Sequence, residues 1–335
     1  MIATSRKFSR ALLGAALGLS FTTTAALAEA YPDRPVTLTV AYGAGGATDF
    51  QARLVTMMSA KEDKEGKPVY LNGQPMVILN RPGAGGQVGW NSFVKKAKPD
   101  GYDLAAYNVP HFIAQSIVFP KKVKYGVDNL EPVANWGADP AVLIVNKDSP
   151  FNSVDDLIAH AKENPGKLTV SGAGLFVGHH IAALQFDKAA GVETKYVPAG
   201  GGVKAMQFVL GGQTQAGFNN LSDAFRNKER LKILAVADLQ RNDFLPDVPT
   251  LKEAGVDVDD SSVNFRGIMA PKGTPEEVLN TLAEKVPAMF GDKKVAKKME
   301  EGGSPMRIMS RAEVQAMWKE RQAYLTELLK DLRKE

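Results

Sequence analysis

The sequence contains no cysteine among its 335 residues. This absence excludes disulfide bonds, thiol catalysis and metal sites that are built from cysteine. It also excludes the cysteine through which bacterial lipoproteins carry their lipid anchor. If the chain is exported, we therefore expect a protein that is not lipid-anchored.

An excess of charge of one sign is also missing. The chain has 41 basic and 37 acidic residues, and removal of the three basic residues before position 11 leaves 38 basic residues. A nearly neutral body offers no extended basic surface to a polyanion. We therefore expect no nucleic-acid partner and no binding to a charged membrane surface.

No segment is apolar for long enough to cross a bilayer. Residues 11–21 (ALLGAALGLSF) are apolar or small throughout, but this run is well short of the roughly 20 residues that a membrane span needs. A basic stretch precedes it, and two small-x-small cleavage sites, Ala26-Leu27-Ala28 and Ala28-Glu29-Ala30, follow it. This order is typical of a secretory signal peptide. We predict that residues 1–28 are a signal peptide and that the mature protein is periplasmic.

Nucleotide-binding fingerprints are absent. In the pattern Gly-x-Gly-x-x-Gly, the third glycine position is occupied by Thr48 in one glycine-rich segment and by Val88 in another. The phosphate-loop pattern G-x-x-x-x-G-K-[ST] does not occur either. Both kinds of nucleotide-binding site need these glycines so that the backbone can approach the phosphates. We therefore expect no cofactor.

Catalytic and metal-binding patterns are equally sparse. The chain has four histidines, and His179 and His180 are adjacent, so on a helix they point in different directions. A nucleophile pair of Ser171 and His180 is conceivable, but no G-x-S-x-G elbow surrounds Ser171. We expect no metal site and no catalytic residue. A secreted hydrolase remains an alternative, and it would differ from a receptor in altering its ligand.

What the sequence does contain is a repeated strand–glycine loop–helix unit. Four apolar, strand-like segments each lead into a glycine-rich turn and then into a helix with apolar residues at helical spacing. The four glycine-rich turns are 43–46, 81–86, 172–174 and 198–202. This alternation predicts an α/β protein with largely parallel, helix-covered sheets. A mature chain of about 305 residues is long for one core, so we expect two lobes.

The glycine-rich turns are candidate ligand-binding loops. In a parallel α/β sheet these turns lie at the carboxyl edge, where ligands bind. The helix that follows each turn supplies free N–H groups and a partial positive charge. Four such loops facing one cleft would bind a carboxylate without a metal. The alternative is that the glycines only form turns.

Five segments, in shared order, carry a resemblance to a known family. The chain resembles the extracytoplasmic receptors of tripartite tricarboxylate transporters, also called Bug-type receptors, from residue 31 to about residue 332. The segments are YPDRPVTLTVAYGAGGATDFQARL at 31–54, NRPGAGGQVGWNSFVKKAKPDGYDL at 80–104, SVDDLIAHAKENPGKLTVSGAG at 153–174, PDVPTLKEAGVDV at 246–258 and FRGIMAPKGTPEEV at 265–278.

The resemblance implies a two-lobed type II periplasmic binding protein fold with two chain crossings between the lobes. Lobe one would comprise residues 31–135 and 240–335, and lobe two residues 136–239. The crossings would lie near 132–140 and 235–240. Residues at such crossings would act as hinges when the lobes close.

The resemblance also implies a function. The protein would bind a small organic carboxylate and deliver it to the large and small integral membrane subunits of such a transporter. We expect a monomer. An alternative is a receptor that presents its ligand to a signalling partner, and the sequence does not separate sensing from uptake.

Receptors of this family hold a ligand carboxylate on the first two glycine loops, partly through ordered water. By resemblance, lobe one would contribute Tyr42, Gly45, Gly46, Thr48, Asp49, Gly85 and Gly86. Lobe two would contribute Ser171, Gly172, Gly174, His180, Pro198, Ala199, Gly200 and Asn219.

Two charged residues have more than one interpretation. Asp49 would contact the ligand only through water or a ligand amine, and an acid in the first turn of a helix is also favoured by the helix dipole alone. Arg266 lies in the apolar run FRGIMA, where a charge needs a partner. That partner would be a second ligand carboxylate or an internal acid.

The chain departs from the family pattern in the distal part of the pocket. Family members often have Tyr-Lys-Gly-Gly after the Val-Pro of the fourth loop, whereas this chain has the smaller, uncharged sequence Ala199-Gly200-Gly201-Gly202. Many have Phe-Asp-Asn where this chain has Phe218-Asn219-Asn220. These differences predict a reshaped distal pocket, with room for a bulkier ligand and without that acidic group.

Overall fold

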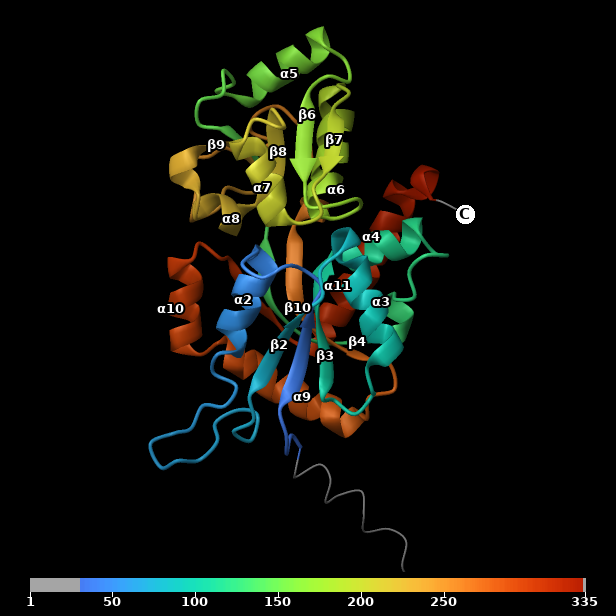
Figure 1. Ribbon diagram of the computed structural model, residues 1–335, viewed down its shortest axis with the longest axis vertical. Coiled ribbons are helices and arrows are strands. Elements are labelled where there is room, and N and C mark those ends of the chain that lie inside the picture. The colour runs from blue at the N-terminus through green and yellow to red at the C-terminus, as the bar shows by residue number, and fades with distance from the viewer. Residues whose placement is uncertain (1–30, 334–335) are drawn as a thin grey trace, which may run out of the picture.

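The computed structural model describes residues 31–333, so the predicted signal peptide lies outside the described residues. Two sheets form the centres of two lobes that lie one above the other (Figure 1). Within the described range, no helix has both the length and the apolar character that a membrane crossing requires.

Lobe one contains a six-stranded sheet with the order β11-β4-β10-β3-β1-β2. Its strands β1, β2 and β3 are parallel to one another. The other three pairings are antiparallel: β10 with β3, β10 with β4, and β11 with β4. The strands are β1 (Val36–Val40), β2 (Met76–Asn80), β3 (Asp103–Val109), β4 (Leu130–Asp139), β10 (Asn264–Pro271) and β11 (Met306–Met309).

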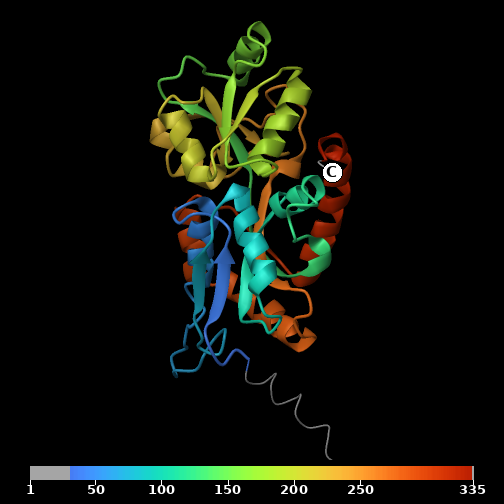
Figure 2. The same cartoon turned by 45° about the vertical axis from the view of Figure 1, so that its right-hand side comes forward.

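Helices cover both faces of this sheet. One apolar cluster joins the sheet to α3, α4 and α11, and a second joins it to α2, α9 and α10. In Figure 2, α11 runs along the outside of lobe one. The helices are α2 (Ala47–Thr56), α3 (Gln87–Lys96), α4 (His111–Val118), α9 (Glu276–Phe290), α10 (Lys293–Glu301) and α11 (Arg311–Leu328), with the short 3-10 helices η1 (Ala84–Gly86), η2 (Val127–Asn129) and η5 (Lys330–Leu332).

Lobe two contains a five-stranded sheet with the order β7-β6-β8-β5-β9. Its apolar clusters join α5 and α6 to one face and α7 and α8 to the other. The strands are β5 (Ala141–Asn146), β6 (Thr169–Gly172), β7 (Lys195–Pro198), β8 (Ala216–Asn220) and β9 (Leu231–Ala237). The helices are α5 (Val154–Glu163), α6 (Gly178–Ala190), α7 (Gly202–Leu210), α8 (Leu221–Phe225), η3 (Lys228–Arg230) and η4 (Asp260–Ser262).

The prediction of largely parallel sheets is wrong. In lobe two, β6 is parallel to β7 and β8, but β5 is antiparallel to β8 and β9. Each antiparallel pair contains a strand next to a point where the chain changes lobe, namely β4, β5 or β10. The chain leaves lobe one on β4 and returns on β10, its neighbour, so these two strands must run in opposite directions.

The first crossing is at Pro140, between the end of β4 and the start of β5. The second crossing is later than the expected 235–240. After β9 the chain stays on lobe two, because Thr250 forms a β-bridge with Val236 and three apolar side chains, those of Leu251, Val256 and Val258, belong to the lobe-two core. Lobe two therefore runs from about residue 141 to residue 262, and the chain re-enters lobe one at β10. The boundaries expected at residues 135 and 240 are corrected accordingly, because β4 keeps residues 136–139 in the lobe-one sheet.

Candidate functional site

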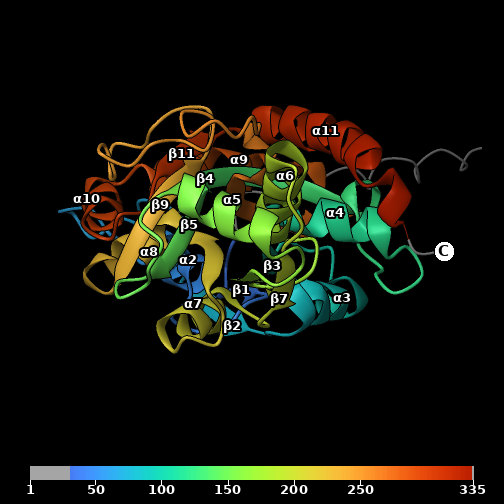
Figure 3. The same ribbon diagram turned by 90° about the horizontal axis from the view of Figure 1, so that it is seen from above.

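A cavity of about 240 Å³ lies between the two lobes. In the view from above, α2 of lobe one and α7 of lobe two lie on the same side of the molecule (Figure 3), and residues of both helices line the cavity. Its lining consists of Tyr42, Gly43, Ala44, Gly46, Ala47, Thr48, Pro82, His111 and Asn264 from lobe one, and Ala173, His179, Gly200, Gly201, Gly202, Val203, Lys204, Gln207, Asn220 and Asp223 from lobe two. Four predicted residues are in this lining: Tyr42, Gly46, Thr48 and Gly200.

The β1–α2 loop forms the lobe-one wall of the cavity. Gly45 has φ +81°, a conformation that favours glycine, and Gly46 is the N-cap of α2. The first N–H groups of a helix have no partner within the helix, and Ala47 and Thr48 of this first turn line the cavity. An anion in the cavity would therefore meet backbone donors and the positive end of the helix dipole.

Asp49 organises this loop from behind the cavity wall. Its Oδ2 accepts a hydrogen bond from the Gly45 N–H at 2.9 Å, and its side chain also pairs with Arg53 and Asn80. Burial tends to raise the pKa of Asp49, but these hydrogen bonds outweigh it and hold that pKa below its usual value. The carboxylate therefore holds the loop in shape and does not line the cavity.

The second glycine loop supports Tyr42 and brings the lobes together. The Tyr42 hydroxyl donates to the Gly85 carbonyl at 3.0 Å. A Cβ on Gly174 would lie only 3.0 Å from the Gly85 Cα, so these two glycines allow the backbones of the two lobes to touch. Gly86 has φ +103°, and a Cβ there would lie 2.6 Å from the Trp90 ring. Gly85, Gly86 and Gly174 therefore lie beside the cavity, outside its lining.

The predicted residues of the third loop lie behind the lobe-two wall. The Ser171 hydroxyl donates to the Ala205 carbonyl at 2.9 Å, and the Gly172 carbonyl accepts from the Ala199 N–H at 2.9 Å. His180 Nδ1 accepts from the Phe176 N–H at 3.1 Å. Ser171 and His180 are thus bonded to other groups, and neither lines the cavity.

His179, the neighbour of His180, lines the cavity instead. Its Nδ1 accepts a hydrogen bond from the Ala173 N–H at 3.1 Å, so in the neutral ring the proton is on Nε2. Burial lowers the pKa of His179 to about 4, with the Asn220 side chain opposing the shift. The ring is therefore neutral at pH 7.

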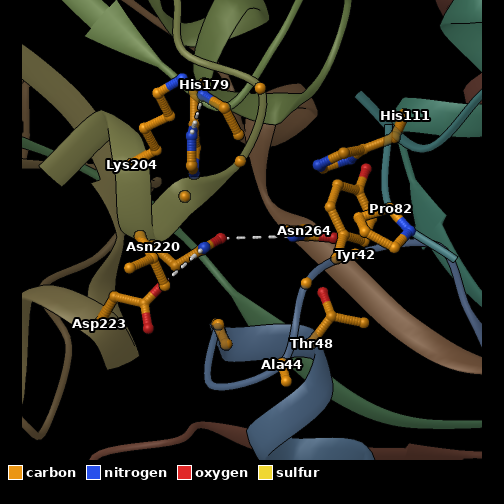
Figure 4. Close-up of a pocket in the computed structure, with 18 of the residues that line it drawn as sticks. Tyr42, Ala44, Thr48, Pro82, His111, His179, Lys204, Asn220, Asp223 and Asn264 are labelled. Atoms are coloured by element: carbon orange, nitrogen blue, oxygen red, sulfur yellow. Dashed lines mark hydrogen bonds between the residues drawn. The ribbon is translucent and has the colours of Figure 1, made fainter. Parts of the chain in front are cut away.

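His111 faces the same space from lobe one, at the start of α4. Figure 4 shows His111 and Tyr42 on the side of the cavity opposite His179 and Asn220. Burial, the main cause, also lowers the pKa of His111. His111 Nδ1 and His179 Nε2 have no hydrogen-bond partner among the residues that the structure describes.

The end of β8 supplies Asn220 where the sequence predicted Asn219. The Asn219 amide donates to the Gly202 carbonyl at 3.0 Å, behind the wall, and Pro198 and Ala199 also lie outside the lining. Asn220 lines the cavity and donates through Nδ2 to Asp223 Oδ2 at 3.2 Å. Asp223 forms an ion pair with Arg226, yet burial is the larger influence and raises its pKa. The wall thus contains an acid, which the sequence argument did not anticipate.

Arg266 is fully buried and lies outside the cavity lining. Of its two expected partners, the structure shows the internal acid, because Nη1 lies 2.6 Å from Asp139 Oδ2. Nη2 donates to Asn220 Oδ1 at 2.7 Å, which orients a cavity residue. Asp139 in turn accepts a hydrogen bond from the Ser222 backbone N–H at 3.1 Å. Asp139 lies at the first chain crossing and Arg266 lies just after the second. Through Ser222 and Asn220, this ion pair therefore connects both crossings to the lobe-two wall of the cavity.

The arrangement is suited to binding. It combines backbone donors, imidazoles, amides and the charged side chains of Lys204 and Asp223 around one cavity, and no group of three or more His, Asp or Glu side chains in residues 31–333 is arranged as a metal site. Two α/β lobes with a cavity between them, beside two chain crossings, are the architecture of a solute-binding protein.

Comparison with known proteins agrees with this class. Residues 65–332 match the family described as tripartite tricarboxylate transporter family receptor, and the chain belongs to this family. It is 32% identical over 270 residues to the UPF0065 protein in the gbd 5′ region of Cupriavidus necator, covering 80% of this chain and 78% of that protein. It is 31% identical over 255 residues to BugT of Bordetella pertussis, covering 75% of each.

Solved structures give the same result. The periplasmic binding protein BugD superposes with a TM-score of 0.79 at 28% identity, covering 90% of this chain and 98% of that one. Rpa4515 of R. palustris with adipate has a TM-score of 0.79 at 27% identity, with 90% and 98% covered. MatC of Rhodopseudomonas palustris with bound malate has a TM-score of 0.77 at 25% identity, with 89% and 100% covered.

Proposed function

We propose that this protein is a periplasmic receptor that binds a small organic carboxylate in the cavity between its lobes. It then delivers that ligand to the large and small membrane subunits of a tripartite tricarboxylate transporter, and it acts as a monomer without catalysing a reaction. The cavity wall formed by the N-terminus of α2 carries the proposal, because it presents backbone donors to an anion without a metal. Two similar structures, with adipate and with malate, support a carboxylate as the ligand.

The first experiment measures carboxylate binding directly. The protein is unfolded and refolded to remove retained ligand, and a panel of mono- and dicarboxylates is then screened by thermal unfolding. A ligand at 100 times its Kd stabilises the protein by about 2.7 kcal/mol, which corresponds to a rise in Tm of about 4 °C for a chain of this length. A panel that gives no shift would contradict the proposal.

A variant with a blocked cavity tests where the ligand binds. Ala44 is exposed on the β1–α2 loop and lines the cavity, so Ala44→Trp should fill the space without disturbing the core. Lys64→Trp, on an exposed loop of lobe one away from the cavity, is the matched control. Ala44→Trp should abolish the thermal shift, and Lys64→Trp should retain it.

Delivery is tested in cells. A strain that lacks the receptor gene should lose uptake of the radiolabelled ligand, and the wild-type gene, but not Ala44→Trp, should restore it. Binding without any effect on uptake would favour the sensing alternative.

A further inference from the structure

The cavity wall that faces the α2 loop has an unusual combination of polar groups. Three side chains of lobe two, those of His179, Asn220 and Asp223, lie together on this wall (Figure 4). They form the distal wall, since a carboxylate at the α2 N-terminus would have its other end toward them. The inference below rests on the proposed carboxylate-binding function and concerns that other end.

His179 presents a hydrogen-bond donor to the cavity. Because Nδ1 accepts from the Ala173 N–H, the single ring proton is on Nε2. His179 is only 2% exposed, and Nε2 has no hydrogen bond of normal geometry with the described residues, although the Asn220 side chain lies close enough to influence the pKa of His179. A buried donor without a partner is costly, so a ligand atom that accepts a hydrogen bond is the natural partner here.

Asp223 presents the opposite chemistry. It is 5% exposed and lines the cavity at the N-terminus of α7, where a Cβ on Gly202 would lie 3.3 Å from Asp223 Oδ2. Asn220 is held in one orientation, because its Oδ1 accepts from Arg266 and its Nδ2 therefore points toward Asp223. The distal wall thus offers a carboxylate acceptor and a neutral donor, with Asn220 between them.

Neither arginine near this wall is free to pair with a second ligand carboxylate. Arg266 is paired with Asp139, and Arg226 is paired with Asp223. Among the described lining residues, Lys204 is the one basic side chain with a permanent charge, and it is exposed to solvent. A second carboxylate would therefore lose its hydration beside Asp223, where like charges repel. The exposed charge of Lys204 compensates only weakly, because solvent screens it.

We propose that the distal wall selects a monocarboxylate whose far end is an uncharged group with both a hydrogen-bond acceptor and a donor, such as a carboxamide. The acceptor atom binds His179 Nε2–H, and the donor binds the Asp223 carboxylate. A hydroxyl group satisfies the same pair less completely, because one oxygen must serve both partners. Specificity arises because the wall forms hydrogen bonds with the neutral group and repels the charged one.

Matched ligand pairs provide the test. Succinamate, glutaramate and adipamate differ from succinate, glutarate and adipate by one amide in place of one carboxylate, at nearly equal size. In calorimetric titrations at pH 7.5, the best amide should bind at least about tenfold more tightly than its dicarboxylate counterpart. Equal affinity, or tighter binding of the dicarboxylates, would overturn the inference and leave the proposed function intact.

Two variants separate the contributions of the wall. His179→Phe keeps a ring but removes the donor, and it should weaken binding of the best amide about tenfold. Asp223→Asn removes the negative charge and should narrow the preference for amide over dicarboxylate. His160→Phe, on α5 away from the cavity, is the matched control and should leave every affinity unchanged.

Each result has a defined consequence. If His179→Phe melts like the wild type and binds the amide equally well, the donor role is wrong. If Asp223→Asn leaves the ratio of the two affinities unchanged, the charge argument is wrong. If neither ligand series binds to the refolded protein, the carboxylate function itself fails, and the inference fails with it.

Discussion

The ion pair between Arg266 and Asp139 allows a quantitative prediction about stability. Both side chains are fully buried, and their charged atoms are 2.6 Å apart. Substitution of Arg266 by Met removes one charge and leaves the Asp139 carboxylate buried without its cation. Breaking a buried pair in this way costs about 3–5 kcal/mol of unfolding free energy. The loss should exceed the effect of the missing contacts alone, because Met fills much of the volume of Arg.

The double variant Arg266→Met/Asp139→Leu distinguishes a pairing effect from general damage. Replacing a buried pair by apolar residues of similar volume is often neutral or stabilising. The double variant should therefore be more stable than Arg266→Met alone. A surface pair is the reference: Arg34 and Asp100 are 56% and 39% exposed, and Arg34→Met should cost at most about 1 kcal/mol.

The assay is urea unfolding at pH 7.5, with unfolding free energies obtained by linear extrapolation and m-values compared among variants. The reasoning would be refuted if Arg266→Met cost no more than Arg34→Met, or if the double variant were no more stable than Arg266→Met alone. Ligand affinity is measured on the same proteins. Because Arg266 orients Asn220 through a hydrogen bond of 2.7 Å, Arg266→Met should weaken the binding of monocarboxylates and dicarboxylates alike. Selective loss of dicarboxylates would instead favour direct contact with a second carboxylate.

Three further predictions follow from other features. Burial lowers the pKa of His180 to about 4, so between pH 6.5 and 4 the unfolded chain binds more protons than the folded protein. This residue should therefore lower the unfolding free energy by about 2–3 kcal/mol from pH 7 to 4.5. In urea unfolding, His180→Gln should show a correspondingly smaller fall. Opening of the lobes should break contacts between them, such as the hydrogen bond from Gln115 Nε2 to the Leu175 carbonyl at 3.2 Å. Small-angle scattering should therefore give a smaller radius of gyration with ligand than without. An equal radius at saturating ligand would exclude hinge closure. N-terminal sequencing of the exported protein should give Glu29 or Tyr31, and retention of Met1 would show that the signal peptide prediction is wrong.

The sequence predicted which loops form the cavity more reliably than which side chains enter it. Glycine loops follow strands at recognisable positions, and Tyr42, Gly46, Thr48 and Gly200 line the cavity. For two residues the neighbour faces the cavity, because adjacent residues point in different directions on a helix or strand. His179 lines the cavity where His180 was expected, and Asn220 where Asn219 was expected. Which of the two histidines faces the cavity depends on where α6 begins, and an apolar pattern alone does not define that first residue.

Long-range partners and irregular segments were beyond the sequence argument. The run FRGIMA correctly indicated that Arg266 needs a partner, but Asp139 is 127 residues away in the chain. Residues 241–259 contain no helix or strand, so they carry no periodic pattern that assigns them to a lobe. Their attachment to lobe two depends on a few apolar side chains and one β-bridge, which is why the second crossing was expected too early.

Lobe two is one uninterrupted stretch of chain, from about residue 141 to residue 262, inserted between two neighbouring strands of lobe one. Its ends are close together, because β4 and β10 are hydrogen-bonded partners. Such an insertion can be exchanged as a cassette. Grafting this stretch onto the lobe one of a relative would transplant His179, Asn220 and Asp223 while the α2 loop stayed in place. Under the proposed function, recognition of the two ends of the ligand could therefore be engineered one end at a time.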